Sequence, residues 1–213
     1  MDYTVIIAAA GTANRMHLGF NKVLYKTNNE TVLERTVSSF LSDKKCKKVV
    51  IAVNPLDLDA IKNLFSDKKV TIEIGGETRS HSVHRALKFV DTEIVMVHDA
   101  ARPFITKSLI NRVRNKLEEG FYSVVPTIIP IDAVLINGHR NSETIVKLVQ
   151  TPQGFNTHQL RKAYDQAFKE KKLANFKDDA SIVEKYFRYV PAEVEGEIDN
   201  IKLTTPKDLK TVG

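Results

Sequence analysis

The amino-acid sequence predicts an α/β fold in which a mainly parallel sheet is flanked by helices. Two observations carry this prediction. Apolar, β-branched runs alternate with segments whose apolar residues recur every three or four positions, as in proteins that alternate strands and helices. The runs are also apolar throughout rather than at every second position, which is typical of strands covered on both faces. We therefore expect helices on both faces of the sheet.

The first part of the chain carries the most regular pattern. Each of its first four strands is followed by a helix. The predicted strands are Thr4–Ala9, Lys48–Val53, Val70–Ile74, Glu93–His98 and Tyr122–Thr127. The predicted helices between them are Thr31–Leu41, Leu58–Ser66, Ser80–Val90 and Thr106–Glu119.

The pattern changes after Thr127. Short β-like runs in Ile128–Gln150 surround Asn137-Gly138, a dipeptide that favours type I′ turns, and predict a projecting β-hairpin arm over about residues 129–150. Arms of this kind often contact a partner subunit. The rest of the chain is expected to form helices Thr157–Lys171 and Asp178–Tyr186, strands Tyr189–Val194 and Ile198–Lys202, and a short helix from Pro206.

Length and composition are those of an ordinary globular chain. The 213 residues are 42% hydrophobic and 27% charged, which argues against disorder, and no run approaches the roughly 18 apolar residues of a membrane helix. The first residues lack the basic segment of a signal peptide, so we expect a cytosolic (cytoplasmic) protein. No repeat or linker divides the chain, and we expect one domain over residues 1–213. Cys46 is the single cysteine, which excludes an internal disulfide, and we interpret it as a bystander thiol.

Charge is the one global quantity that points to a partner. The 32 Lys and Arg residues against 26 Asp and Glu residues give a net charge of +6. Such an excess favours anionic partners, either nucleotides or nucleic acids.

The turn after the first strand is a candidate ligand site, because open parallel sheets bind ligands at the carboxyl ends of their strands. Ala9-Ala10-Gly11 would let the backbone approach phosphate oxygens, and Arg15 and Lys22 would add two positive charges. The absence of G-x-x-x-x-G-K-[ST] disfavours a Walker-type ATPase or kinase, and the absence of G-x-G-x-x-G weakens a dinucleotide site. On this segment alone, a tight turn with two solvated cations is an equal alternative.

Two glycines follow the third strand. Gly75 and Gly76 would permit backbone contact with a base, and Ser80 or Ser82 would cap the next helix. Capping accounts for the serines but leaves the glycine pair unexplained.

Charged residues stand at two further strand ends. Asp99 follows the fourth strand, where a carboxylate beside phosphates is a natural Mg²⁺ ligand; it would otherwise cap a helix or pair with Arg102. His98 is interpreted as an interior hydrogen-bonding residue. Lys202 is predicted at the tip of a strand, where it either neutralises a phosphate or is solvated. Four such segments, all at the carboxyl ends of strands, favour a nucleotide site over coincidence.

These segments make the chain similar to a known family. It resembles the 2-C-methyl-D-erythritol 4-phosphate cytidylyltransferases of the non-mevalonate isoprenoid pathway. The matches run in order over nearly the whole chain and are most specific at His98-Asp99-Ala100-Ala101-Arg102-Pro103. The others are Ala9-Ala10-Gly11 through Arg15-Met16, Lys22, Gly75-Gly76 through Arg79, Ser82-Val83, Thr151-Pro152-Gln153, Asp178-Asp179-Ala180-Ser181, Val194-Glu195-Gly196, Asn200-Ile201-Lys202 and Thr204-Thr205-Pro206.

The resemblance implies a Rossmann-like nucleotidyltransferase fold, a homodimer joined through the hairpin arms, and a Mg²⁺-dependent transfer of CMP from CTP to methylerythritol phosphate. It assigns Arg15 and Lys22 to the transition state, Lys202 to the substrate phosphate and Asp99 to Mg²⁺. The implied substrate-binding residues are Ala9, Ala10, Gly11, Gly75, Gly76, Glu77, Ser82, Ala100, Asp132 and Lys147.

The chain departs from the family pattern at four places. Ala13 stands where the family has a second glycine, and Asn21 where it often has proline. In the arm, Asp132-Ala133 replaces Asp-Thr. The arginine that grips the acceptor phosphate is also missing: Glu143 occupies its position, and the candidate replacements are Lys147 and Arg140. The nucleotide half of the site is therefore intact by sequence, whereas the acceptor half is altered.

Two other functions stay open. The missing arginine favours a cytidylyltransferase of the same fold that acts on another polyol phosphate, such as ribitol 5-phosphate. The net charge and the runs Lys44–Lys48 and Lys169–Lys172 favour a non-catalytic nucleotide- or RNA-binding module, but these runs lack interleaved aromatic residues. We expect CTP and a sugar-alcohol phosphate as ligands, with neither nucleic acid nor a membrane as partner.

Overall fold

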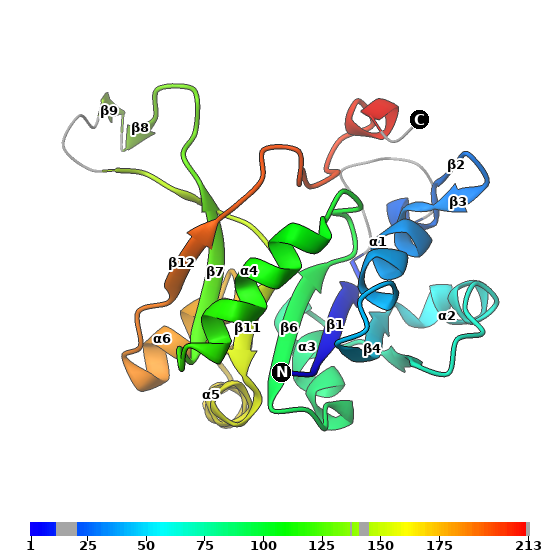
Figure 1. Cartoon of the computed structure of the whole chain (residues 1–213), viewed down its shortest axis with the longest axis horizontal. Helices are drawn as coiled ribbons and strands as arrows, with labels where there is room; N and C mark the ends of the chain where they lie inside the picture. Colours follow the sequence, from blue (N-terminus) through cyan, green and yellow to red (C-terminus); the bar gives the residue numbers. More distant parts are fainter. Residues whose placement is uncertain (12–20, 137, 141–144, 212–213) are drawn as a thin grey trace.

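An eight-stranded sheet forms the centre of the computed structural model, which describes residues 1–11, 21–136, 138–140 and 145–211 (Figure 1). The strand order is β10-β7-β11-β6-β1-β4-β5, with β12 added beside β7. The parallel part consists of β1 (Tyr3–Ala9), β4 (Cys46–Val53), β5 (Val70–Ile74) and β6 (Ile94–Asp99).

The other half of the sheet is mixed. β11 (Gln153–Asn156) lies between β6 and β7 (Ser123–Ile128) and is antiparallel to both. β10 (Leu148–Val149) is antiparallel to β7, whereas β12 (Ala192–Glu195) is parallel to it. β6 and β7 therefore run in the same direction, so their carboxyl ends lie at the same edge of the sheet as those of β1, β4 and β5.

The register of the central strands brings chemistry-bearing residues together at that edge. Ala8 of β1 pairs with Asp99, the last residue of β6, and Ala9 pairs with Val53 of β4. All six residues of β6 are buried, as are most of β1 and β4. The backbone of this edge is thus held by a rigid, fully packed sheet.

Helices cover both faces of the sheet, as the sequence predicts (Figure 1). The apolar residues of α1 (Val32–Leu41), α2 (Leu58–Lys62) and α4 (Lys107–Glu118) pack into the core on one face. Those of α3 (Arg79–Ala86), α5 (Thr157–Lys169) and α6 (Asp179–Phe187) pack into the core on the other. Short pieces complete the chain: β2 (Lys26–Thr27), β3 (Glu30–Thr31), η2 (Lys22–Leu24), η3 (Pro55–Asp57), η4 (Leu87–Phe89), η5 (Leu173–Asn175) and η6 (Asp208–Thr211).

The predicted elements of the first 128 residues are confirmed. Each of the five predicted strands lies within two residues of its observed bounds. The predicted helix Leu58–Ser66 is shorter, because α2 ends at Lys62, and the predicted helix Ser80–Val90 is divided between α3 and η4. Helices Thr157–Lys171 and Asp178–Tyr186 are confirmed as α5 and α6.

Three predictions for the last part of the chain are corrected. The strand Tyr189–Val194 is shifted to Ala192–Glu195, and the helix from Pro206 is a 3₁₀ turn over Asp208–Thr211. The predicted strand Ile198–Lys202 is wrong. Instead of pairing with a strand, this segment forms a turn in which the amide of Asn200 donates to the carbonyl of Glu197. The amide of Leu203 donates to the carbonyl of Ala101, in the loop after β6.

β11 was not predicted, because its sequence Gln153-Gly154-Phe155-Asn156 lacks the β-branched pattern of the other strands. Gly154 has a packing role. A Cβ on it would lie 2.5 Å from Val113 Cγ1 and 2.7 Å from Leu117 Cδ1, so the glycine lets α4 lie directly on the strand.

The predicted hairpin arm is confirmed. β8 (Leu135–Ile136) pairs with β9 (His139–Arg140) in antiparallel fashion, and Gly138 has a positive φ of 82°. Asn137, the other turn residue, lies outside the described residues. The arm projects from the sheet between β7 and β10 (Figure 1).

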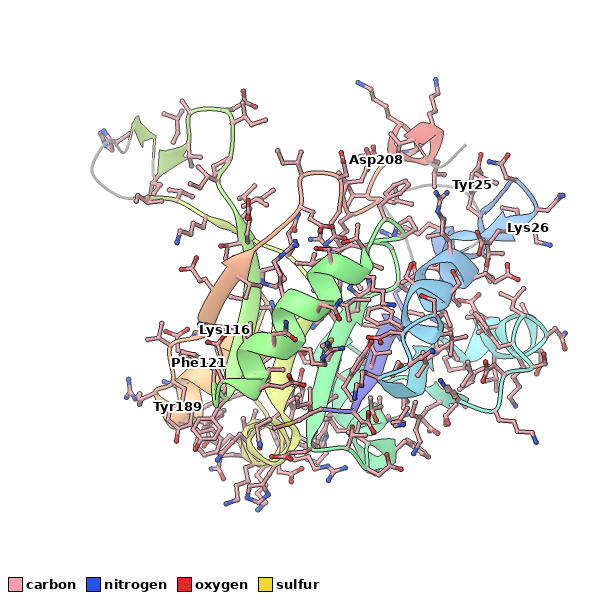
Figure 2. The ribbon with its side chains drawn as sticks, viewed as in Figure 1. Tyr25, Lys26, Lys116, Phe121, Tyr189 and Asp208 are labelled. Atoms are coloured by element: carbon pink, nitrogen blue, oxygen red, sulfur yellow. The ribbon has the colours of Figure 1, made fainter. Side chains whose placement is uncertain are left out.

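Aromatic side chains gather on the surface at the start of β7 (Figure 2). Tyr122 stacks on Tyr189 with ring centroids 4.9 Å apart, and the Lys116 ammonium lies 4.5 Å from the ring centroid of Phe121. These contacts lie beside the first residue of β7, at the end of that strand opposite its carboxyl end. Among the described helices, none combines the length and the apolar character needed to cross a membrane.

Candidate active site

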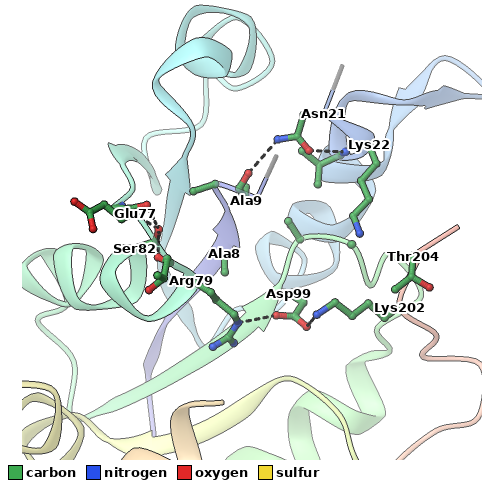
Figure 3. Close-up of a pocket in the computed structure, with 17 residues that line it drawn as sticks. Ala8, Ala9, Asn21, Lys22, Glu77, Arg79, Ser82, Asp99, Lys202 and Thr204 are labelled. Atoms are coloured by element: carbon green, nitrogen blue, oxygen red, sulfur yellow. Dashed lines mark hydrogen bonds and ion pairs between the residues drawn. The ribbon is translucent and has the colours of Figure 1, made fainter. Parts of the chain in front are cut away.

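A cavity of about 410 Å³ opens at the carboxyl ends of β1 and β6 (Figure 3). Its wall combines residues from the start, the middle and the end of the chain. Among the residues predicted from sequence, it is lined by Ala9, Ala10, Gly11, Lys22, Gly76, Glu77, Ser82, Asp99, Ala100 and Lys202.

The first turn enters the cavity directly from β1. Asn21 is bonded to the end of β1 and to η3: its Nδ2 donates to the Ala9 carbonyl at 3.2 Å and to Asp57 at 2.8 Å. Its Oδ1 accepts from the amide of Val23, which caps η2. Lys22 therefore begins a short helix anchored to the end of β1. Arg15 and Ala13 lie outside the described residues, so the predicted role of Arg15 stays a prediction.

Gly75 and Gly76 are required for close packing rather than for an unusual backbone angle. A Cβ on Gly75 would lie 2.6 Å from Ala10 Cβ and 2.7 Å from Ser82 Oγ, and one on Gly76 would lie 2.5 Å from His81 Cβ. Gly76 lines the cavity, whereas Gly75 lies behind it. The pair lets the segment after β5 pack tightly against the first turn.

The prediction that Ser80 or Ser82 caps the helix after Gly76 is wrong, because neither serine caps α3. The cap is Thr78, whose hydroxyl accepts from the amide of His81. Ser82 instead accepts a hydrogen bond from the amide of Gly76 at 3.0 Å and donates to the Thr78 carbonyl at 2.9 Å. Its hydroxyl thus fixes the loop that forms one wall of the cavity.

Asp99 lies among three cations. Its Oδ1 is 3.0 Å from Arg79 Nε, and its Oδ2 is 2.7 Å from Lys202 Nζ and 3.9 Å from Arg102 Nε. Burial alone would raise the pKa of Asp99, but Arg79, followed by Lys202 and Arg102, outweighs burial and holds this pKa well below its usual range. Asp99 is therefore a permanent anion at neutral pH, paired mainly with Arg79 and Lys202.

His98 is an interior residue, as predicted. Its Nε2 donates to the Arg102 carbonyl at 3.1 Å, and its Nδ1 accepts from the Thr151 hydroxyl at 3.0 Å. The Thr151 hydroxyl in turn accepts from the amide of Asp99. Burial lowers the pKa of His98 to about 4, so the ring is neutral and serves to brace the end of β6.

Lys202 reaches the cavity from a loop. Arg102 Nη1 donates to the Asn200 carbonyl at 2.6 Å, and the Asn200 side chain donates to the Thr151 carbonyl at 2.8 Å. The next residue is also held, because Lys22 Nζ donates to the Leu203 carbonyl at 2.6 Å. The loop therefore places Lys202 near Asp99 and links it to Lys22.

Two predicted residues lie away from the cavity in this single chain. Asp132 is exposed in the arm. Lys147 pairs with Glu193 of β12 at 2.6 Å, with more than a third of each side chain exposed. Glu143 is outside the described residues. The acceptor half of the site is thus not assembled by the described residues of one chain.

Arg79 is the main residue that sequence reasoning left out of the site. Its position within the matched Gly75–Arg79 motif was the available signal. The structure places its guanidinium at the cavity wall beside Asp99 (Figure 3). The same guanidinium also pairs with Asp179 in the interior.

The cavity fits Mg²⁺ carried by a nucleotide better than a metal held by protein alone. Among the described residues, no group of three or more His, Cys, Asp or Glu side chains is arranged to hold a metal ion. Mg²⁺ in nucleotide sites needs only one or two carboxylates, because phosphate oxygens and water complete its shell. Asp99 is one such carboxylate and lines the cavity.

Comparison with known proteins agrees with this geometry. The family model for 2-C-methyl-D-erythritol 4-phosphate cytidylyltransferase matches residues 3–212. The enzyme of that name from Bacillus velezensis is 36% identical, over 98% of this chain and 93% of its own length. The crystal structure of the Thermus thermophilus enzyme has a TM-score of 0.81 at 31% identity, covering 99% of this chain and 97% of that chain. The Francisella tularensis enzyme structure has a TM-score of 0.85 at 28% identity, covering 100% and 98%.

These matches confirm the predicted Rossmann-like nucleotidyltransferase fold and the enzyme class. They set aside the non-catalytic binding module, which the net charge and the two lysine runs had suggested. Several of the lysines behind that suggestion are in ion pairs, including Lys47 with Asp2 and Lys48 with Asp91. The chain belongs to the 2-C-methyl-D-erythritol 4-phosphate cytidylyltransferase family.

Proposed function

We propose that this protein transfers the cytidylyl group of CTP to 2-C-methyl-D-erythritol 4-phosphate and releases pyrophosphate. The observation that carries the proposal is the meeting of Lys22, Asp99 and Lys202 in one cavity, although they come from distant parts of the chain. An oxygen of the acceptor phosphate forms a bond to the α-phosphorus of CTP, and the bond from that phosphorus to the pyrophosphate oxygen breaks. A phosphate dianion is already a nucleophile, so the reaction needs no general base.

Catalysis then depends on alignment and on balancing the negative charge that gathers at the five-coordinate phosphorus. Lys22 is suited to this role because η2 and the Leu203 carbonyl fix its ammonium at the cavity wall. Lys202 is suited to the acceptor phosphate. Arg15 is proposed as the second transition-state cation on the strength of the family motif.

Mg²⁺ is part of the proposal. When bound, the ion neutralises phosphate charge and orients the triphosphate. Asp99 is the residue that would hold it. Because Asp99 Oδ2 bonds Lys202 in this structure, release of that oxygen would also free the lysine for the acceptor phosphate.

The nucleotide subsite favours a pyrimidine by shape. Ala8, Ala10, Gly76 and Ser82 are small residues that line the cavity. Because Gly75 packs tightly against Ala10 and Ser82, this wall has no space behind it into which it could move to enlarge the cavity. We therefore expect a cytosine ring to be accepted and the larger purines to be excluded.

Homodimerisation through the arm is proposed for the acceptor subsite. Ile129, Ile131, Leu135 and Ile145 of the arm are 66%, 87%, 62% and 73% exposed. Covering apolar surface of this kind with a partner contributes about 25 cal/mol of favourable free energy per Å². A second copy would cover these side chains and bring Asp132 and Lys147 toward the partner's cavity, where a phosphate would need a cation. We also expect the enzyme to act in the cytosol.

The environment of Lys147 favours an alternative acceptor substrate. Lys147, a candidate for the missing arginine, is already paired with Glu193, and a lysine cannot grip a phosphate in the bidentate manner of arginine. Another polyol phosphate, such as ribitol 5-phosphate, is therefore the alternative substrate.

The test is turnover by the purified protein. CTP and Mg²⁺ are combined with methylerythritol phosphate or with ribitol 5-phosphate, and pyrophosphate release is followed. Higher kcat/KM for methylerythritol phosphate is expected, and its failure to react would refute the proposal. Asp99→Ala is the blank that reports contaminating activity, and ATP, GTP and UTP test the preference for cytosine.

A further inference from the structure

A buried ion-pair chain runs from the cavity into the protein interior. The Arg79 guanidinium lies between two carboxylates: Nε is 3.0 Å from Asp99 Oδ1, and Nη2 is 2.8 Å from Asp179 Oδ2. The other oxygen of Asp179 accepts from the Tyr164 hydroxyl. Three elements, α3, α5 and α6, thus converge behind the end of β6.

Asp179 has no path to a substrate. Its side chain is fully buried and does not line the cavity, and Tyr164 is fully buried as well. Burying a carboxylate costs free energy unless cations and hydrogen-bond donors compensate it, and Arg79 is its charged partner. The buried charge of Asp179, which has no contact with the cavity, therefore holds Arg79 in a single orientation.

That orientation divides the guanidinium between two acids. A free arginine–aspartate pair favours the bidentate arrangement, in which two N–H groups bind both oxygens of one carboxylate. Here Asp179 takes Nη2, so Asp99 receives Nε on Oδ1 alone. Oδ2 of Asp99 is left for a second cation, and in this structure that cation is Lys202 at 2.7 Å.

We propose that Arg79 is a positioning residue that fixes the rotamer of Asp99, under the control of Asp179, so that Oδ2 stays available to the metal–nucleotide complex. This inference rests on the proposed cytidylyltransferase reaction and adds residues to its metal site. Arg79 is not a catalytic residue, because its unpaired Nη1 is shielded from solvent and its other nitrogens are engaged.

The direct readout is metal binding without turnover. Mn²⁺ replaces Mg²⁺, CTP is present, the acceptor is omitted, and free Mn²⁺ is followed by electron paramagnetic resonance. Arg79→Gln is expected to weaken Mn²⁺ binding about 10- to 100-fold, as loss of a residue that orients a metal ligand does. Tighter or unchanged Mn²⁺ binding would overturn the proposal, because Arg79 would then be a competing cation or a bystander.

Two conservative variants separate orientation from charge. Arg79→Lys keeps the positive charge but lacks the fork that reaches both carboxylates, so it should not restore Mn²⁺ affinity. Asp179→Asn keeps the size of the side chain but removes the charge that holds Nη2 of Arg79, so the guanidinium is expected to turn to the bidentate arrangement on Asp99. Asp179→Asn should therefore weaken Mn²⁺ binding, as Arg79→Gln does. Full affinity in Asp179→Asn would overturn the control of Arg79 by Asp179, and full affinity in Arg79→Lys would show that charge alone suffices.

Steady-state kinetics gives a second readout. The Arg79 variants should lose kcat at a fixed Mg²⁺ concentration and regain part of it at high Mg²⁺, with the acceptor KM unchanged.

Arg114→Gln is the control variant. It breaks a comparably buried arginine–aspartate pair, with Asp43 near the start of β4, and should leave Mn²⁺ affinity unchanged. If the wild type binds Mn²⁺–CTP but transfers nothing to methylerythritol phosphate, the proposed function fails while the Mn²⁺ titrations still decide the role of Arg79.

Discussion

The ammonium of Lys202 lies 2.7 Å from Oδ2 of Asp99, which joins the residue proposed for the acceptor phosphate to the residue proposed for the metal. The pair connects the loop before η6 to the end of β6 and spans about half the chain. In the proposed reaction, a metal–nucleotide complex would take the place of Lys202 at this oxygen and free the lysine for the acceptor phosphate.

Replacing Lys202 by methionine is expected to lower kcat about 100- to 1000-fold, because a cation at the reacting phosphates is lost. Lys202→Arg should recover part of the rate, since it keeps the charge at a different reach. Steady-state kinetics with both substrates measures the effect. Lys210→Met removes an exposed lysine of η6 and should be indistinguishable from the wild type; an equal loss in both variants would contradict the assignment.

The buried ring of His98 predicts a pH-dependent stability. Burial lowers the pKa of His98 to about 4, below the ordinary value of 6.5, so the unfolded chain binds more protons than the folded protein between these values. The free energy of unfolding should therefore fall by about 3 kcal/mol as the pH falls through that window. Urea unfolding of wild type and His98→Gln tests this, because glutamine keeps both hydrogen-bonding roles without titrating. His158→Gln, at an exposed position in α5, should retain the wild-type slope.

Asn21 should be replaceable by proline but not by alanine. Its φ of −69° is the angle that a proline ring imposes, so Asn21→Pro fixes the backbone that the side-chain bonds to Ala9 and Val23 now hold. Asn21→Ala loses the cap, at a cost of about 1 kcal/mol, and frees Lys22 from β1. The measurements are thermal unfolding and kcat. A kcat for the alanine variant equal to that of the proline variant would show that Lys22 needs no such anchor.

The arm supplies a prediction about assembly. Ile131→Asp places a charge on a side chain that is 87% exposed in the single chain and should convert a dimer to a monomer, with loss of acceptor turnover. Sedimentation velocity reports the mass. Leu56→Asp is the matched control, because Leu56 is 94% exposed on η3 outside the arm. A wild type that sediments as a monomer would refute assembly through the arm.

The parallel half of the fold was predictable because each of its strands is a local apolar run. No such run exists for β11, whose place depends on α4 packing against Gly154. The predicted strand Ile198–Lys202 fails for the opposite reason. Its residues have a strand-like pattern, but the backbone carbonyl of Asn200 accepts from Arg102 and its side-chain amide donates to the Thr151 carbonyl. Tertiary contacts that the local sequence does not encode decided both cases, through packing for β11 and through hydrogen bonds for residues 198–202.

Some residues of the site were likewise predictable from the sequence and others were not. Lys22, Asp99 and Lys202 were predictable because each is a charged residue within a recognisable motif, and all three line the cavity. The bond of Arg79 to Asp179 spans 100 residues and has no local signature. Lys147 meets Glu193 rather than the cavity, and the sequence could not place it because the arm leaves the body of the subunit.

The contact of Lys22 with the Leu203 carbonyl spans 181 residues. During synthesis, the lysine leaves the ribosome long before its partner does. A nascent chain can pair its first strands early, yet its catalytic cavity lacks one wall until the loop that carries Lys202 and Leu203 emerges. The protein is therefore expected to gain nucleotide affinity only after that loop has emerged.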